Sequence, residues 1–213
     1  PIHIERYIGS ILQNKFTNRT ANTHLVTLKS FCRWLTEHYD LSNPCQKIKM
    51  LDEDPPKVRV LDDQEYQKVL SICNPKERDI ILFLFHTGLR SSEFQQLTWS
   101  NISQDRRFIK LVGKGRRFRI IPLNKTCQKI LNNIPRKPDS TTMNLVKSYE
   151  APNSLYRLCK KLARHARIPR FGPQALRHYF ATSLYTKGVP VQFISACLGH
   201  ADTRTTEKIY IHI

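Results

Sequence analysis

The spacing of apolar residues predicts two helices within residues 1–50. Near the N-terminus, apolar positions recur three and four residues apart, which is the period of a helix with one buried stripe. A polar turn at 17–20 leads to a second helix, and Asn43-Pro44 ends the pair. We expect Lys29 and Arg33 to point outward from the second helix. Its inward residues are predicted to be Leu25, Leu28, Phe31, Cys32, Leu35 and Tyr39.

A charged stretch with two prolines, residues 51–60, separates these helices from the rest of the chain. Because differently patterned halves flank it, we interpret it as a hinge rather than an ordinary surface loop. The sequence therefore predicts a helical domain over 1–50, a linker over 51–60 and a second domain over 61–213. Two helices make a thin core, so we expect the first domain to lack one or more N-terminal helices.

The second domain begins with a capping box, Asp62 with Glu65, which starts a helix. A strongly apolar helix over 79–86 is predicted to be central to the core. A Thr-Gly pair ends it, so that Arg90 lies at a turn before a short helix over 91–97.

Two short strands at 108–112 and 117–121 are predicted to form a hairpin with Lys114 at its glycine-flanked tip. A helix is expected over 124–134, whereas 135–152 carry no clear pattern. The next helix is predicted to start at an Asn153 cap. Its inward residues are Leu155, Leu158, Cys159, Leu162, Ala163 and Ala166, and its outer face carries Arg157, Lys160, Lys161 and Arg164.

Two further helices close the pattern. Pro173 opens the first and Gly188 ends it, while Pro190 opens the second and Gly199 ends it. The predicted fold class is therefore mainly α, with one small antiparallel β-hairpin.

The charge of the chain points to an acidic partner. Lys and Arg number 35 against 17 Asp and Glu, a formal net charge of +18, which favours nucleic acid over a merely soluble basic surface. The basic outer face of the helix after Asn153 is then either solvated or DNA-facing. No apolar run or signal-peptide pattern suggests a membrane. The six cysteines lack metal-ligand spacing, which predicts buried, reduced thiols of a cytoplasmic protein without a zinc site.

The C-terminal residues carry candidate chemistry. The pattern places Arg177 and His178 in one helix, His200 just after the next, and Tyr210 beyond it. Guanidinium groups bind phosphate through paired charge-assisted hydrogen bonds, and a tyrosine phenol can attack a phosphodiester.

Five short motifs, in the same order along the chain, carry a resemblance to a known family: HTGLRSSE (86–93), GKGRRFRIIPL (113–123), LRHYFAT (176–182), LGH (198–200) and the terminal TT…Y. The chain resembles the tyrosine recombinases, the phage-integrase type of site-specific recombinase. The resemblance implies the catalytic fold of that family, preceded by a partial core-binding domain that clasps double-stranded DNA. It implies cutting and rejoining through a 3′-phosphotyrosyl intermediate without metal, ATP or another cofactor. It also implies a homotetramer on two DNA sites, with a dimer at each site.

The same resemblance assigns roles to single residues. Arg90 and Arg177 would bind the scissile phosphate, with His200 donating a hydrogen bond to it. Tyr210 would be the nucleophile, and Lys114 would protonate the leaving 5′ oxygen. Two supporting residues are expected, Glu93 to orient the arginine and the histidine, and His178 outside direct contact with substrate.

The chain departs from the family pattern at three places. Gln174 stands where a histidine is usual, and glutamine cannot carry a proton. Tyr210 lies one residue farther from LGH than usual, and relatives commonly continue into a longer C-terminal tail. Two alternatives therefore stay open: a catalytically impaired DNA-binding protein of the same fold, and a topoisomerase-like DNA relaxer.

Overall fold

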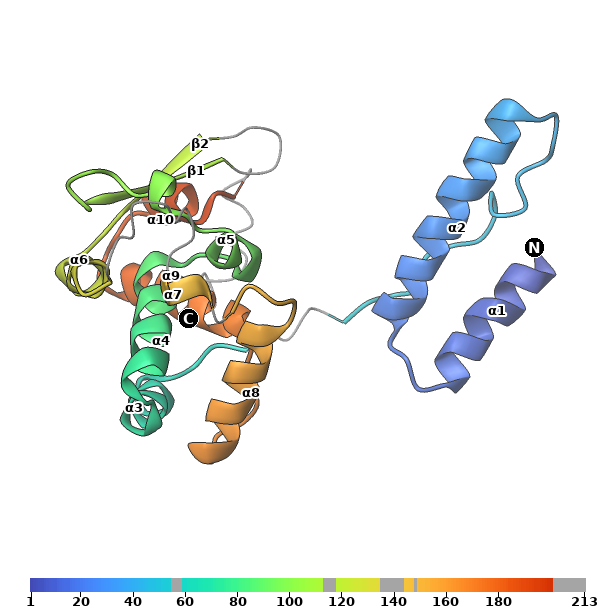
Figure 1. Ribbon diagram of the computed structural model, residues 1–213. Helices are drawn as coiled ribbons and strands as arrows, with labels where there is room; N and C mark the ends of the chain where they lie inside the picture. Colours follow the sequence, from blue (N-terminus) through green and yellow to red (C-terminus); the bar gives the residue numbers. More distant parts are fainter. Residues whose placement is uncertain (55–58, 113–117, 135–143, 148, 201–213) are drawn as a thin grey trace. The chain divides into compact units, whose positions relative to one another are not determined.

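The computed structural model describes residues 1–54, 59–112, 118–134, 144–147 and 149–200. The chain divides into two compact units, Pro1–Lys57 and Val58–Ile213. The first unit holds the antiparallel helices α1 (Ile2–Gln13) and α2 (Asn18–His38), seen in Figure 1.

A small core holds these two helices together. It consists of Ile8 and Ile11 from α1 with Ala21 and Leu25 from α2. The buried Asn22 extends this contact, because its side chain donates to the Leu51 carbonyl at 2.8 Å and accepts from the Leu51 N–H at 2.9 Å. The chain after α2 is thereby fastened back onto the helix.

The prediction that Phe31 and Tyr39 point inward is wrong. Both residues are more than half exposed, at 55% and 56%. They lie beside Trp34, which also stacks on His38 with ring centroids 4.8 Å apart. The physical reason is that α1 covers one stripe of α2, whereas the apolar residues of α2 extend beyond that stripe.

The second unit contains the hairpin and the remaining described helices. Its elements are α3 (Asp63–Ile72), α4 (Pro75–Thr87), α5 (Ser91–Gln95), the 3₁₀ helix η1 (Trp99–Asn101), β1 (Phe108–Val112), β2 (Phe118–Pro122), α6 (Lys125–Asn132), α7 (Asn144–Lys147), α8 (Ser154–His165), α9 (Pro173–Thr186) and α10 (Val191–Leu198). The predicted fold class, mainly α with a small antiparallel hairpin, is confirmed. In the described part of the chain, no helix is both long enough and apolar enough to span a bilayer.

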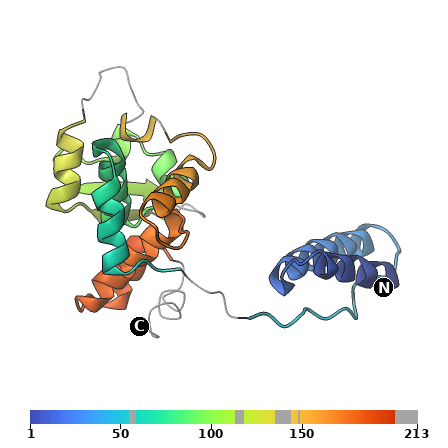
Figure 2. The same cartoon turned by 90° about the horizontal axis from the view of Figure 1, so that it is seen from below.

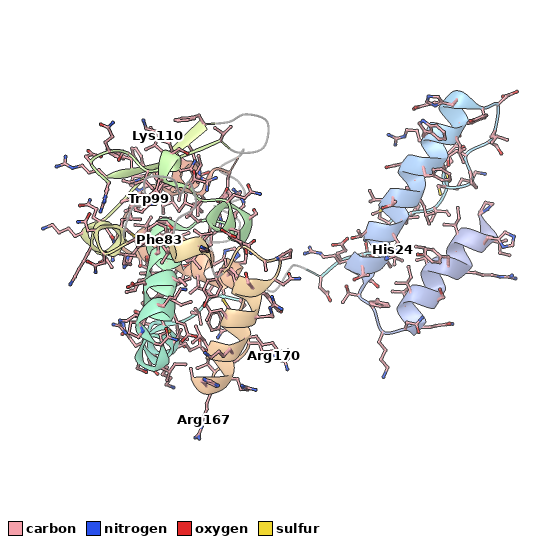
Figure 3. All side chains as sticks on the ribbon, viewed as in Figure 1. His24, Phe83, Trp99, Lys110, Arg167 and Arg170 are labelled. Carbon is pink, nitrogen blue, oxygen red and sulfur yellow. The ribbon has the colours of Figure 1, made fainter. Side chains whose placement is uncertain are left out.

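Helix α4 forms the centre of this unit. It lies between α6 and α8 in two perpendicular views (Figures 1 and 2). Its residues Ile80, Ile81 and Phe83 are fully buried, and Phe83 lies deep among the side chains in Figure 3. The predicted central helix is confirmed, but it begins four residues earlier than expected. Asn74 forms a capping box with Glu77 there.

Most of the predicted helix ends follow local chemistry, but the predicted Asn153 cap does not form. Asp62 and Glu65 form the predicted capping box of α3. Gly88 ends α4 and Gly199 ends α10, both in the left-handed conformation that favours glycine. Asn153 precedes α8 but makes no side-chain cap bond, because its own backbone is left-handed at φ +61°.

The contacts of α10 bring distant parts of the sequence together. Helix α10 packs against α9 and against β2, and α9 packs against α4. The antiparallel pairing of β1 with β2 places Leu111 opposite Arg119. As a result the ends of α4 and α10, one face of α9 and the inner face of β2 converge.

We expect Gly88→Ala to destabilise the second unit by about 3 kcal/mol. A Cβ at this position would lie 2.5 Å from Phe180 Cδ1, and the φ of +60° adds strain of about 1–2 kcal/mol for an L residue. Urea unfolding measures the effect in a Trp34→Phe background, where Trp99 alone of the two tryptophans reports.

Gly188→Ala is the matched control. Its φ is +78°, but nothing lies within 4 Å of the added Cβ, so only the backbone cost of about 1 kcal/mol is expected. Equal losses in the two variants would contradict the proposed clash with Phe180.

Candidate active site

The structure brings four of the predicted site residues together. Arg90 and Glu93 follow the left-handed turn after α4, Arg177 lies in α9, and His200 follows α10. These segments meet because α9 packs against both α4 and α10. Residues 90 and 93 are far in sequence from 177 and 200, so this convergence comes from the tertiary fold.

Arg177 is the most buried charged side chain of the group, with 2% of its surface exposed. Its Nη1 donates to the Gly88 carbonyl at 2.7 Å, and its Nη2 donates to the Leu198 carbonyl at 2.5 Å. Nη2 also lies 3.1 Å from His200 Nε2. The guanidinium therefore connects the turn after α4 to the turn after α10.

The protonation of His200 follows from this contact. Arginine can only donate, so His200 Nε2 accepts and the ring carries its proton on Nδ1. Burial, followed by the positive charges of Arg177 and Arg90, lowers the pKa of His200 to about 4. His200 is consequently a neutral imidazole at pH 7.

Arg90 is held by Glu93, which lies one helical turn later. Its Nη1 donates to Glu93 Oε1 at 2.9 Å, and its backbone N–H donates to Glu93 Oε2 at 2.7 Å. The Arg90 side chain nevertheless remains 41% exposed to solvent.

Arg119 is a member of the group that the sequence reasoning missed. This residue of β2 is 8% exposed and pairs with Glu93 through two bonds, Nη1 to Oε1 at 2.8 Å and Nη2 to Oε2 at 2.7 Å. The alternation of the strand was the available signal, because Arg119 occupies the inward position two residues before the buried Ile121.

The charges of this cluster leave a positive surplus. Burial alone would raise the pKa of Glu93, but the hydrogen bonds from Arg119 and Arg90 and the charge of Arg119 outweigh it and lower this pKa to about 2. Glu93 is therefore ionised at neutral pH and balances one of three arginines. With His200 neutral, two positive charges remain, which suits an anion such as a phosphodiester.

Two predicted residues of α9 differ in their surroundings. Gln174 is exposed in the first turn, one turn before Arg177. His178 is buried, and this burial together with the charge of Arg177 lowers its pKa to about 4. Lys114 and Tyr210 lie outside the described residues.

A second positively charged surface lies along α8. Arg157, Lys160, Lys161 and Arg164 are all exposed, as predicted, and with Ile168 and Arg170 they line one surface pocket. Arg167 and Arg170 lie beyond the end of α8 on the outside of the unit (Figure 3). Among the described residues, no group of three or more His, Cys, Asp or Glu side chains is placed to hold a metal ion.

Comparison with known sequences identifies the family. The sequence model of the phage integrase family matches residues 59–213. Over its whole length the chain is 31% identical to a tyrosine recombinase of Pseudothermotoga lettingae, covering 77% of that protein. It is 30% identical to tyrosine recombinase XerA of Thermococcus onnurineus, over 95% of this chain and 74% of the relative. The chain belongs to the phage integrase family, and the predicted resemblance is confirmed.

Solved structures share the fold. The Tn1549 transposon integrase, in complex with transposon right end DNA, superposes with a TM-score of 0.71 at 22% identity, over 99% of this chain and 80% of that one. XerH site-specific recombinase, bound to palindromic difH substrate in a post-cleavage complex, gives 0.75 at 21% identity over 98% and 65%. XerA recombinase gives 0.62 at 25% identity over 100% and 78%. The architecture is that of the tyrosine recombinases.

We expect Glu93→Gln to destabilise the second unit by about 3 kcal/mol at pH 7, because the buried Arg119 loses its counterion. The folded-state pKa of Glu93, about 2, lies below its ordinary 4.5. Its contribution is therefore complete above pH 4.5 and is lost as the pH falls toward 2. Urea unfolding of both proteins between pH 7 and pH 3 should show the difference shrinking below pH 4.5.

Glu150→Gln, at an exposed position, serves as the control and should change stability little at any pH. A Glu93→Gln deficit that stayed constant down to pH 3 would contradict the assigned ion pair.

Proposed function

We propose that this protein is a site-specific recombinase or integrase that cuts and rejoins double-stranded DNA through a 3′-phosphotyrosyl intermediate. The observation that carries the proposal is the meeting of Arg90, Arg177 and His200 around two left-handed glycine turns. Membership of the phage integrase family gives this cluster its expected chemistry.

In this proposal the two arginines bind the scissile phosphate. Arg90 offers the half-exposed guanidinium, and Arg177 fixes the position of His200. Their positive charge stabilises the pentavalent transition state, in which negative charge builds up on the non-bridging oxygens. His200, as a neutral imidazole with its proton on Nδ1, can donate a hydrogen bond from that nitrogen to a phosphate oxygen. Gln174 can donate to the phosphate through its amide.

The reaction then proceeds in two balanced steps. The phenol oxygen of Tyr210 attacks phosphorus while its proton passes to a solvent water, and the bond to the 5′ oxygen breaks. Lys114 gives that oxygen its proton, so a 5′-hydroxyl is released. A 5′-hydroxyl from the partner strand later attacks the phosphotyrosine and regenerates Tyr210. The covalent link retains the energy of the phosphodiester, so the exchange consumes no ATP.

DNA is the proposed partner, and α8 supplies part of its binding surface. The net charge of +18 and the exposed basic residues of α8 support this assignment. The Tn1549 integrase and XerH were both solved with DNA. We assign residues 1–50 to a core-binding domain, 51–60 to a linker and 61–213 to the catalytic domain. The proposed assembly contains four protomers on two DNA sites. Its proposed location is the cytoplasm, in association with DNA.

A DNA-binding protein of the same fold without cleavage activity is the second candidate. Gln174 favours it, because an amide at this exposed position cannot exchange a proton with the reacting groups.

A covalent trapping assay tests the proposal. The substrate is a pool of labelled duplexes with randomised sequence around one 5′-bridging phosphorothiolate. Attack there releases a thiol, which rejoins poorly, so a covalent adduct accumulates. We expect the wild-type protein to give a denaturant-resistant, DNA-linked band that is absent in Tyr210→Phe.

Tyr185→Phe is the matched control, since it removes a hydroxyl from the same unit, and it should keep the band. A band that persisted in Tyr210→Phe would assign the chemistry to another residue. If the wild type binds the duplexes but gives no band, the second candidate replaces the first.

Salt dependence tests the role of α8. The logarithm of the binding constant falls with the logarithm of salt concentration by about 0.9 for each phosphate neutralised. We therefore expect Arg157→Gln/Lys160→Gln to reduce this slope by about 1.8, measured by fluorescence anisotropy with labelled duplex.

Lys68→Gln/Lys129→Gln removes the same charge from exposed positions on α3 and α6. This control should change the slope far less. Equal changes in the two double variants would mean that α8 carries only a solvated face.

A further inference from the structure

We propose that Arg119 is a positioning residue of the candidate active site, which holds Glu93, and through it Arg90, in the arrangement needed to bind phosphate. This inference rests on the proposed function and extends it to a residue of β2, which would act through Glu93.

The first observation is that Glu93 is held from two sides. Its Oε1 accepts from Arg119 Nη1 at 2.8 Å and from Arg90 Nη1 at 2.9 Å. Its Oε2 accepts from Arg119 Nη2 at 2.7 Å and from the Arg90 backbone N–H at 2.7 Å. Each carboxylate oxygen is thus shared between the two arginines, and the plane of the carboxylate is fixed by the fork of Arg119.

The second observation is the contact of Arg119 with the turn before His200. A Cβ built at Gly199 would lie 2.5 Å from Arg119 Nη1 and 2.8 Å from its Cδ. The side chain of Arg119 therefore runs directly beneath this turn. Arg90 Nη2 approaches the carbonyl of the same Gly199 at 3.5 Å. Arg119 thereby contacts both segments that present candidate phosphate ligands.

The third observation is energetic. An ion pair as buried as Arg119 with Glu93 loses the hydration of both charges, and an apolar pair of similar volume is often as stable. Arg119 Nε is also buried without a hydrogen-bond partner among the described residues, which adds a further cost. Such a pair is better explained by the orientation that it imposes than by net stability.

Arg119 also links the site to the hairpin. It lies five residues after Lys114 in sequence, on the strand that leaves the hairpin tip. Strand β2 packs against α10, and its Arg119 pairs with Glu93 of α5. The ion pair therefore joins β2 to the turn that presents Arg90. The strand that follows Lys114 in sequence and the turn that presents Arg90 are consequently joined through one carboxylate, that of Glu93.

The test measures the rate of adduct formation and the affinity for duplex in the trapping assay. Arg119→Met removes the fork but keeps a long side chain. We expect adduct formation to slow by about 100-fold, since a misplacement near 1 Å has an effect of that size, while duplex affinity changes less than threefold. Arg119→Lys should recover part of the rate, because an ammonium group can hold one carboxylate oxygen but not both.

Two controls separate positioning from folding. Arg107→Met removes an exposed arginine just before β1 and should leave the rate unchanged. Urea unfolding gives the folded fraction of each variant, by which its rate is divided. If division by the folded fraction restored the adduct-formation rate of Arg119→Met to that of the wild type, the proposal would be overturned.

A double variant tests whether Arg119 acts through Arg90. The rate of Arg119→Met/Arg90→Lys should match that of Arg90→Lys alone, because without the Arg90 guanidinium Arg119 has no group left to position. Independent effects that multiply would overturn the inference.

Failure of the proposed function is distinguishable from failure of this inference. A wild-type protein without an adduct refutes the function alone. The positioning role is then tested by NMR of the Arg90 Nε–H resonance, which should shift in Arg119→Met and stay in place in Arg107→Met. An unshifted resonance in Arg119→Met would refute the positioning role.

Discussion

The buried guanidinium of Arg177 is the interaction on which the candidate site depends. A cation with 2% exposure needs acceptors to replace water, and here they are the carbonyls of Gly88 and Leu198. Both belong to the last turn or the cap of a helix, where carbonyls have no partner within the helix and the helix dipole is negative. One side chain therefore satisfies the ends of α4 and α10 and finds its own compensation there. The hydrogen bonds that compensate the buried charge of Arg177 are therefore the same ones that satisfy the carbonyls at the two helix ends.

The same local design is used at both helix ends. Each helix stops at a left-handed glycine, and a candidate phosphate ligand follows within two residues, Arg90 after Gly88 and His200 after Gly199. The turns determine where these side chains begin, whereas the contacts with Arg177 and Glu93 determine where they end. The packing of α9 brings these segments together, and the backbone stops and buried charges then fix the geometry of the site.

The sequence predicted the elements well because each depends on neighbours in the chain. Apolar spacing, the capping box at Asp62 and the glycine stops could all be located in this way. The features that were missed depend on contacts distant in sequence. The spacing that placed Phe31 on an apolar face could not show whether another element covers that face. Arg119 was missed because a charged residue is expected at the surface unless its buried partner, here Glu93 from a separate segment, is already known.

One buried residue of α4 also affects how the surface of α8 would meet DNA. Glu77 completes the capping box of its own helix and accepts from Lys161 Nζ at 2.7 Å. The positive charge of Lys161 is therefore already matched within the protein. On meeting a phosphate it would exchange one anionic partner for another and release no counterion, unlike its neighbours Arg157, Lys160 and Arg164. The basic residues of α8 would therefore contribute unequally to the free energy of DNA binding. Lys161 mainly ties α8 to the start of α4 through Glu77.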